Sequence, residues 1–324
     1  MSFEPLTESI VPPGTVAFGI QLPIQSQSTI YVEDWERTAG PEAMAAVARQ
    51  AEASGFLYVA VCDHTIIPRR LAQAMSTTWY DTTATLGWLA GCTTRVRLLS
   101  HVYIAALRHP LRAAKEFATL DALSGGRLIV GVGAGHVTEE FGIMGAVFDQ
   151  RGKLLDEAID GIAAALTEEF PTLSGPTWPA TDLGISPRPV QEPRPPIWVG
   201  GSSMPALRRV AARADGWLPQ TPKRSDMAEL IPKLEAMREE LHPGKPLAIG
   251  ALGGPVYVGQ ASWELPRGTV SGGAEELAES LRAWPAMGVS HIQLRFPSRS
   301  ADELCEQIEA FAGDVAPLVG PQPA

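Results

Sequence analysis

The chain has 324 residues, of which 45% are hydrophobic and 19% are charged. This composition is that of a folded protein and excludes a disordered tail or linker. With 26 Lys and Arg against 36 Asp and Glu, the net charge is -10. That balance argues against a nucleic-acid-binding surface, so an anionic ligand needs a local group of basic residues.

The cysteines are Cys62, Cys92 and Cys305, widely spaced and without a CxxC pattern. They indicate neither a disulfide framework nor a zinc site. The amino terminus has no basic segment followed by an apolar core, and no window reaches the ~20 apolar residues of a membrane span. We therefore expect a cytoplasmic protein that acts on a small-molecule substrate and has no membrane or nucleic-acid partner.

Eight apolar, strand-like segments alternate with helical segments along the chain. The expected strands are 15–23, 56–64, 95–105, 127–135, 196–201, 215–220, 247–259 and 290–296. The expected helices are 40–55, 80–91, 110–123 and 149–167, then helices that end near 214, 241 and 287, and a terminal helix. This alternation predicts an α/β protein with a parallel sheet, and the number eight favours a closed (β/α)8 TIM barrel over an open doubly wound sheet.

The barrel is expected to form one domain over residues 15–318. An amino-terminal extension at 1–14 precedes it and a short tail at 319–324 follows it. Residues 168–196 contain eight prolines and few apolar runs, which predicts an insertion or a long loop rather than a second domain.

In such a barrel the active site lies at the carboxyl ends of the strands. Asp63 and His64 follow the second strand, and an imidazole beside a carboxylate suits proton transfer near neutral pH. A hydrogen-bonded pair that only caps the strand is the alternative. A metal site is disfavoured, because the chain has no HxH pair on its first strand and no HExxH motif.

Two loops of small residues follow the fourth and fifth strands. They consist of Gly133, Ala134, Gly135, His136 and Val137, and of Gly200, Gly201, Ser202 and Ser203. Such loops can hold a phosphate on backbone N–H groups, or they can be tight turns chosen for packing. Arg295 should end the eighth strand and needs an anionic partner if it is buried. Apolar candidates for the rim are Ile66, Ile67, Trp79, Tyr80 and Phe296.

Several motifs together resemble the bacterial luciferase-like monooxygenase superfamily. They are RHP at 108–110, ATLDALSGGR at 118–127, PPIWVGG at 195–201 and GVSHIQLRF at 288–296. The similarity covers residues 15–318. It implies a barrel enzyme that uses FMN or the deazaflavin coenzyme F420, and the sequence is more similar to the F420-dependent branch.

The resemblance also implies roles for individual residues. Asp63 and His64 match a pair that lies over the cofactor ring, where the His assists proton transfer. The family's third strand carries a non-proline cis peptide that backs the ring, which falls on His101–Val102, directly after Ser100. Relatives usually have a small residue at the position of His101, so its imidazole could add a second titratable group. The loops 133–137 and 200–203 match segments that contact the ribityl chain and phosphate, and family members commonly form homodimers.

Three functions stay open at this point. The preferred one is an oxidoreductase that transfers a hydride between F420 and an unidentified organic substrate. The second is an FMN-dependent monooxygenase of the same fold, and the third is a flavin-binding barrel without turnover. Substrate-binding residues vary across the family, so the sequence does not identify the substrate.

Overall fold

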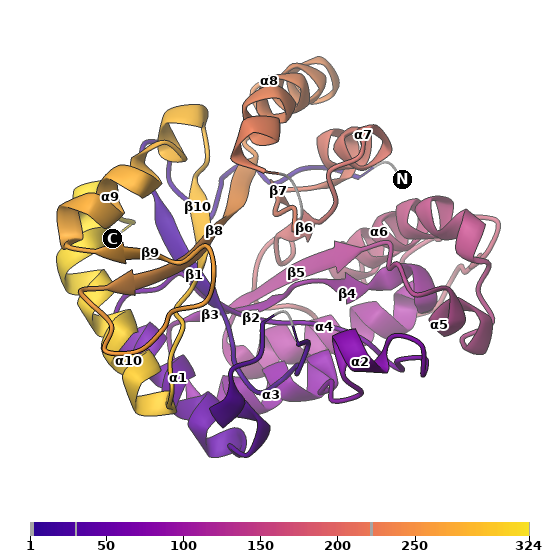
Figure 1. Ribbon diagram of the computed structural model, residues 1–324. Coiled ribbons are helices and arrows are strands. Elements are labelled where there is room, and N and C mark those ends of the chain that lie inside the picture. Colours follow the sequence, from indigo (N-terminus) through magenta and orange to yellow (C-terminus); the bar gives the residue numbers. More distant parts are fainter. Residues whose placement is uncertain (1–2, 30, 221–222, 324) are drawn as a thin grey trace.

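The computed structural model describes residues 3–29, 31–220 and 223–323. Its central feature is a ring of parallel strands in the order β10-β1-β2-β3-β5-β6-β7-β8, closed by pairing of β8 with β10. The strands are β1 (Ala17–Gln21), β2 (Tyr58–Val61), β3 (Arg97–Ser100), β5 (Leu128–Gly133), β6 (Ile197–Val199), β7 (Gly216–Trp217), β8 (Ala248–Val258) and β10 (His291–Arg295). Helices surround these strands (Figure 1), which confirms the predicted (β/α)8 barrel.

The helices lie close to their predicted positions. Those that follow the barrel strands are α1 (Pro41–Ala53), α3 (Thr82–Cys92), α4 (Pro110–Ser124), α6 (Arg151–Thr167), α7 (Met204–Arg213), α8 (Arg224–Leu241), α9 (Ala274–Arg282) and α10 (Ala301–Ala310). The boundaries of α4 show why sequence signals sufficed. Pro110 takes the first helical position, and Gly125 ends the helix with a left-handed φ of 66°.

Short elements were not predicted. They include α2 (Ala72–Met75), β4 (Tyr103–Ile104), α5 (Thr138–Ile143) and β9 (Val270–Gly272). The expected third strand at 95–105 is interrupted at the cis peptide His101–Val102 and resumes as β4. The expected helix before Met287 is preceded by β9, which pairs with β8. Segments of two to six residues give too little periodicity to be recognised in a sequence.

The barrel interior is filled by three aromatic rings. The imidazole of His291 stacks on Trp198 at a centroid distance of 4.2 Å, and Tyr58 meets these two rings edge to face at 5.7 and 5.6 Å. Three glycines on the surrounding strands face the rings: Gly19, Gly216 and Gly250. A Cβ atom at these glycines would lie 2.2 to 2.4 Å from Tyr58, Trp198 and His291, respectively. Each glycine is the register partner of the ring residue on the neighbouring, paired strand, so the rings fit only because these strands lack a side chain at that point.

The amino-terminal segment packs against the barrel. Ile10 contacts the interior cluster that includes Tyr58 and Trp198. The backbone N–H of Leu6 donates to Asp215 at 2.9 Å, and the same carboxylate forms a buried ion pair with Arg194 at 2.6 Å. The segment predicted as an extension is thus fixed to the barrel by hydrogen bonding and apolar contact.

The proline-rich stretch 168–196 packs over α4 and α6. Its one antiparallel bridge joins Leu173 and Ala180. The guanidinium of Arg188 donates to the backbone carbonyls of Ala165 and Leu166 near the end of α6. Asp121 of α4 accepts hydrogen bonds from the backbone at 190 and 191. No described helix is long and apolar enough to cross a membrane.

The fit of the interior rings is tested by Gly250→Ala, whose added Cβ would lie 2.2 Å from His291. Overpacking of this kind costs about 1–3 kcal/mol, so we expect the free energy of unfolding in urea to fall by at least this amount. The control is Gly91→Ala in α3, where a Cβ meets nothing within 4 Å. It should be neutral or stabilising by about 0.5–1 kcal/mol. Equal effects of the two substitutions would contradict the packing described.

Candidate active site

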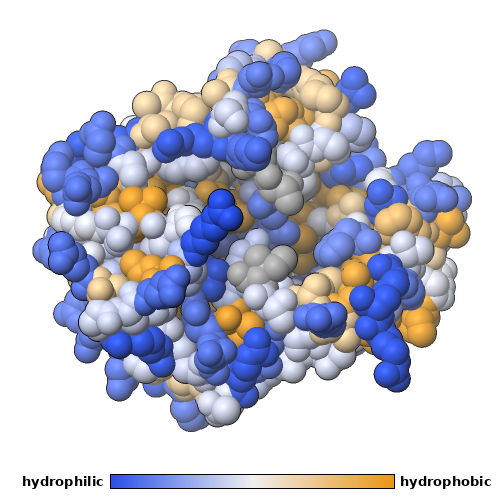
Figure 2. Space-filling model, in the orientation of Figure 1, coloured by the Kyte–Doolittle hydropathy of each residue, from blue (hydrophilic) through white to orange (hydrophobic). Residues whose placement is uncertain are grey.

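The predicted site residues gather on one rim of the barrel. They follow the carboxyl ends of β2, β3, β5, β6 and β10, and parallel strands of a closed barrel all end on the same side. Figure 2 shows a face with a hollow near its centre, where pale and hydrophobic surface lies inside a mostly hydrophilic surround.

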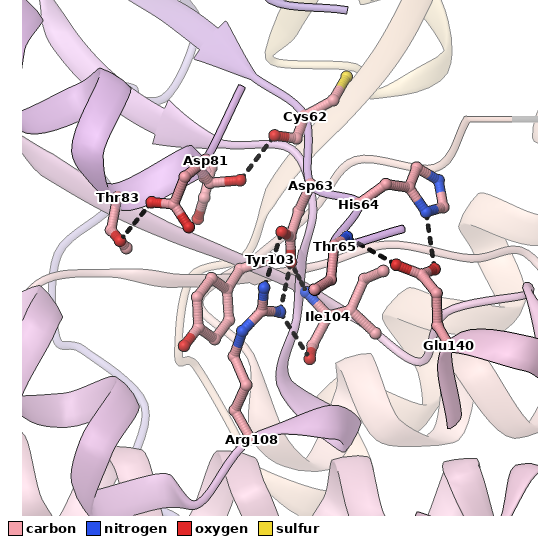
Figure 3. A network of polar contacts seen from close by, with 12 residues as sticks. Cys62, Asp63, His64, Thr65, Asp81, Thr83, Tyr103, Ile104, Arg108 and Glu140 are labelled. Atoms are coloured by element: carbon pink, nitrogen blue, oxygen red, sulfur yellow. Dashed lines mark hydrogen bonds and ion pairs between the residues drawn. The ribbon is translucent and has the colours of Figure 1, made fainter. Parts of the chain in front are cut away.

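His64 is held by a buried carboxylate from a different strand–helix unit. Its Nδ1 lies 2.8 Å from Oε2 of Glu140, in the first turn of α5. The other oxygen of Glu140 accepts the backbone N–H of Thr65 at 2.7 Å and of Ile66 at 3.3 Å. Side-chain exposure is 7% for His64 and 0% for Glu140. Glu140 thus fixes both the imidazole and the backbone that follows it (Figure 3).

This contact determines which nitrogen of His64 is available for chemistry. A carboxylate accepts hydrogen bonds, so Nδ1 carries a proton and Nε2 is the atom that can gain or lose one. Burial raises the pKa of Glu140, but the hydrogen bonds from His64, Thr65 and Ile66 outweigh it and hold this pKa below its usual range. An ionised carboxylate that fixes the tautomer of a histidine is an arrangement used in general acid–base catalysis.

Asp63 makes different contacts from those expected. Its side chain accepts two hydrogen bonds from the guanidinium of Arg108, at 2.5 and 2.9 Å, and one from the backbone N–H of Ile104 at 2.7 Å. Burial alone would lower the pKa of Arg108. The negative charge of Asp63 and its hydrogen bonds outweigh this effect, so the pKa of Arg108 is raised above its usual value. Figure 3 shows this ion pair beside the His64–Glu140 pair. Asp63 therefore joins the loop after β2 to the segment that leads into α4, while Glu140 orients His64.

Two further rings contact His64. Trp79 lies edge to face at a centroid distance of 4.5 Å, and its indole N–H donates to the backbone carbonyl of Met75 at 3.2 Å. His136 lies at 5.2 Å with an interplanar angle of 86°. Burial and the neighbouring His64 lower the pKa of His136.

His101 crosses the barrel interior. Its Nε2 lies 3.3 Å from the carbonyl oxygen of Leu218, which follows β7, three strands away from β3 in the ring. Burial lowers the pKa of His101 to about 4 and that of His291 to about 3. Both imidazoles are therefore neutral at neutral pH. The expectation that His101 could titrate in the same range as a catalytic histidine is wrong.

The cis peptide expected between His101 and Val102 is present. The side chain of Val102 lies between the ends of β5 and β6, because a Cβ at Gly133 would be 2.4 Å from it and a Cβ at Gly200 would be 3.1 Å from it. Gly135 and Gly201 have left-handed φ values of 75° and 90°, which favour glycine. Packing and turn geometry thus account for the glycines of both loops.

The loop after β6 offers backbone donors at a helix start. Ser203 caps α7, its hydroxyl accepting the backbone N–H of Ala206 at 3.4 Å. Within the described residues the backbone N–H groups of Gly201 and Ser203 make no hydrogen bond. Arg208, one turn into α7, is exposed. Free N–H groups at a helix N-terminus are suited to an anion.

Other predicted site residues are engaged within the protein. The hydroxyl of Ser100, 0% exposed, bonds both backbone groups of Gly131 and continues the β3–β5 ladder. Val137 is also fully buried.

Arg295 ends β10 as expected, and its anionic partner is Glu33, at 3.0 Å. Ala134 is half-buried at the end of β5, and Ser202 is half-buried beside Ser203. Phe296 is 3% exposed and packs on Phe56 and Phe311, so it belongs to the core and not to the rim.

Glu140 is the partner of His64 that sequence analysis missed. It lies 76 residues after His64, in the sequence TEE at the start of α5. Acidic residues are common at helix starts because they stabilise the helix dipole, so this one did not stand out. The available signal was that Glu140 follows His136 by four residues, and that His136 lies in the loop after β5 at the predicted rim.

A family model described as luciferase-like monooxygenase matches residues 16–269. The chain belongs to this family. Members of the luciferase-like family are oxidoreductases, monooxygenases among them. An uncharacterised protein of Mycobacterium tuberculosis (strain ATCC 25618 / H37Rv) is 30% identical over 291 residues, which are 84% of this chain and 93% of that protein. The F420-dependent glucose-6-phosphate dehydrogenase of Kineococcus radiotolerans is 27% identical over 329 residues, covering 87% of this chain and 94% of that enzyme.

Solved structures share the luciferase-like barrel. The F420-dependent tetrahydromethanopterin reductase of Methanopyrus kandleri has a TM-score of 0.73 at 18% identity, covering 94% of this chain and 99% of that one. The monooxygenase RslO1 of Streptomyces bottropensis has a TM-score of 0.75 at 19% identity, covering 93% and 99%. These similarities show the fold.

The neutral state of His101 makes the fold sensitive to acid. Its pKa is about 4 in the folded protein, against an ordinary 6.5, so the unfolded chain binds more protons between these values. The contribution of this histidine to the free energy of unfolding is fully present above pH 6.5 and is lost as the pH falls towards 4. Between pH 7 and pH 5 the loss is about 2 kcal/mol. His101→Gln cannot be protonated, and urea unfolding at pH 7 and pH 5 should show a smaller loss for this variant than for the native protein. Equal losses would contradict a buried neutral His101.

Proposed function

We propose that the protein is an F420-dependent oxidoreductase that transfers a hydride between F420 and a small organic substrate. The observation that carries this proposal is the His64–Glu140 pair at the barrel rim, near the cis peptide His101–Val102. The pair provides one oriented acid–base group, which is what a hydride transfer between an alcohol and a carbonyl needs in addition to the cofactor.

The donor set of the rim fits the phosphate of such a cofactor. The backbone N–H groups of Gly201 and Ser203 at the start of α7 would hold it. The cis peptide lies between this loop and the barrel interior, because Val102 packs against both glycine loops. When bound, F420 supplies a carbon atom, C5, that gives or receives a hydride.

His64 moves the proton that accompanies this hydride. In the oxidising direction Nε2 of His64 would accept the hydroxyl proton of an alcohol substrate. In the reducing direction Nε2 gives the proton to the carbonyl oxygen. Glu140 keeps Nδ1 protonated in both directions, so it is a positioning residue. Trp79 packs against the ring and limits its rotation.

Two observations favour F420 over FMN. Among the similar proteins, the Kineococcus dehydrogenase and the Methanopyrus reductase are named as F420-dependent. Arg208 lies one turn into α7, after the loop that follows β6, and Lys223 directly precedes α8. Both are exposed, and neither forms an ion pair with a described residue. F420 carries an acidic tail beyond its phosphate, whereas FMN ends at the phosphate, so exposed cations help F420 more. An FMN-dependent monooxygenase is the second candidate, because RslO1 shares the fold.

Cofactor preference is measured first by equilibrium binding to the purified protein. We expect F420 to bind at least ~10-fold more tightly than FMN, a difference of about 1.4 kcal/mol. Arg208→Glu should weaken F420 binding by roughly 10-fold and FMN binding less, with the difference reduced by salt. The control is Arg49→Glu on the exposed side of α1, which should change neither affinity. Tighter FMN binding, with oxygen consumption by the reduced FMN complex, would establish the second candidate instead.

Turnover of the F420 complex tests the acid–base assignment. With alcohols as hydride donors and the loss of oxidised F420 absorbance as the signal, His64→Ala should lower kcat by roughly 10²-fold or more, with F420 affinity nearly unchanged. Glu140→Gln keeps an acceptor for Thr65 and Ile66 but removes the charge, and we expect a loss of roughly 10-fold or more. The matched control is Glu139→Gln, which only breaks an exposed ion pair with Arg70. Native turnover and an unchanged pH profile in His64→Ala would place the chemistry elsewhere.

A further inference from the structure

The acid–base chemistry proposed above leaves His136 without a role. This residue lies in the loop after β5 and is exposed, whereas only 7% of the His64 side chain is exposed. The two imidazoles meet edge to face with their centroids 5.2 Å apart. Trp79 occupies a second side of His64, at 4.5 Å. The contact with His136 therefore joins a nearly buried imidazole to one that is open to solvent.

Of the described carboxylates near this pair of rings, only Glu140 is not paired with an arginine. Glu140 bonds His64 and also acts on His136. Asp63, next to His64 in the chain, is neutralised by Arg108 at 2.5 Å. Glu139 is paired with Arg70 at 2.6 Å. Two imidazoles thus face a single uncompensated negative charge.

We propose that His64 and His136 bind protons in competition with each other, and that His136 is a positioning residue whose charge changes how readily His64 is protonated. A proton on one ring disfavours a proton on the other, because like charges about 5 Å apart repel through a partly solvated region. The carboxylate of Glu140 compensates one positive charge but not two. The pair then titrates as a unit, with two steps that belong to both rings.

The coupling matters for proton transfer because the two rings differ in their exposure to solvent. His136 exchanges protons directly with solvent, whereas His64 is nearly enclosed by Glu140, Trp79 and His136. When His64 gives its proton away, its charge is lost and His136 can hold a proton in its place. When His64 gains a proton, His136 releases one to solvent. This consequence for catalysis rests on the proposed function, whereas the coupling itself is a property of the chain without cofactor.

The coupling is tested by NMR titration of the histidine ring resonances in the full-length protein without cofactor. Three variants place different charges at position 136: His136→Lys, His136→Gln and His136→Glu. We expect the titration midpoint of His64 to be lowest in the Lys variant, intermediate in the Gln variant and highest in the Glu variant. Charges at this separation predict steps of roughly 0.5 to 2 pH units. A purely structural role of His136 would not produce this order.

Reciprocity provides an independent check. His64→Gln should raise the midpoint of His136 by the same amount as His136→Gln raises that of His64, because the coupling free energy is one quantity. Arg49→Glu, a charge change on α1, should move neither midpoint. His64 midpoints that agree within about 0.2 pH units across the three folded variants would overturn the proposal. That result would leave hydride transfer untouched, because F420 binding and turnover test that function separately.

Discussion

Closure of the sheet depends on how its interior is filled. The rings of Tyr58, Trp198 and His291 each occupy space that the neighbouring, paired strand leaves free by having glycine at the register partner. A barrel interior is a packed core, and here it is packed with groups that also carry polar atoms. Within the described residues, the ring N–H of Trp198, Nε2 of His291 and Nδ1 of His101 have no hydrogen-bond partner. The interior therefore tolerates these imidazoles only in their neutral form.

Two carboxylates at the rim perform different structural tasks. Asp63 binds Arg108, the first residue of the RHP motif, while His109 caps α4 with its ring and Pro110 begins the helix. The motif that carries the family resemblance thus fixes the connection from β3 to α4. Glu140 performs the other task, because it bonds His64 and the backbone of the same loop. Asp63 therefore stabilises the position of the loop, and Glu140 controls the state of the imidazole that the loop carries.

The sequence predicted the barrel, the order of its strands and the rim on which the candidate site residues lie, because strand–helix alternation is a local signal that survives folding. It placed His64 on this rim for the same reason, since the residue follows an apolar strand. It did not predict the partner of His64. Adjacency in the chain suggested Asp63, but successive residues at a strand end point in different directions. The true partner, Glu140, is brought in from α5 by tertiary structure, and an acidic residue at a helix start has an ordinary local explanation.

Depth in the barrel separates the histidines into chemical classes. His291 and His101 lie in the interior, where loss of hydration keeps them neutral and removes them from acid–base chemistry at neutral pH. His136 is exposed, and an exposed imidazole alone has no means of excluding water from a reacting centre. His64 lies between these extremes, with one nitrogen held by a carboxylate and the other without a partner among the described residues. A proton-transfer group needs both a protected position and an exchangeable proton. In the proposed mechanism the contact between His64 and His136 joins these two requirements at one point on the rim, a contact that neither residue type nor spacing in the sequence reveals.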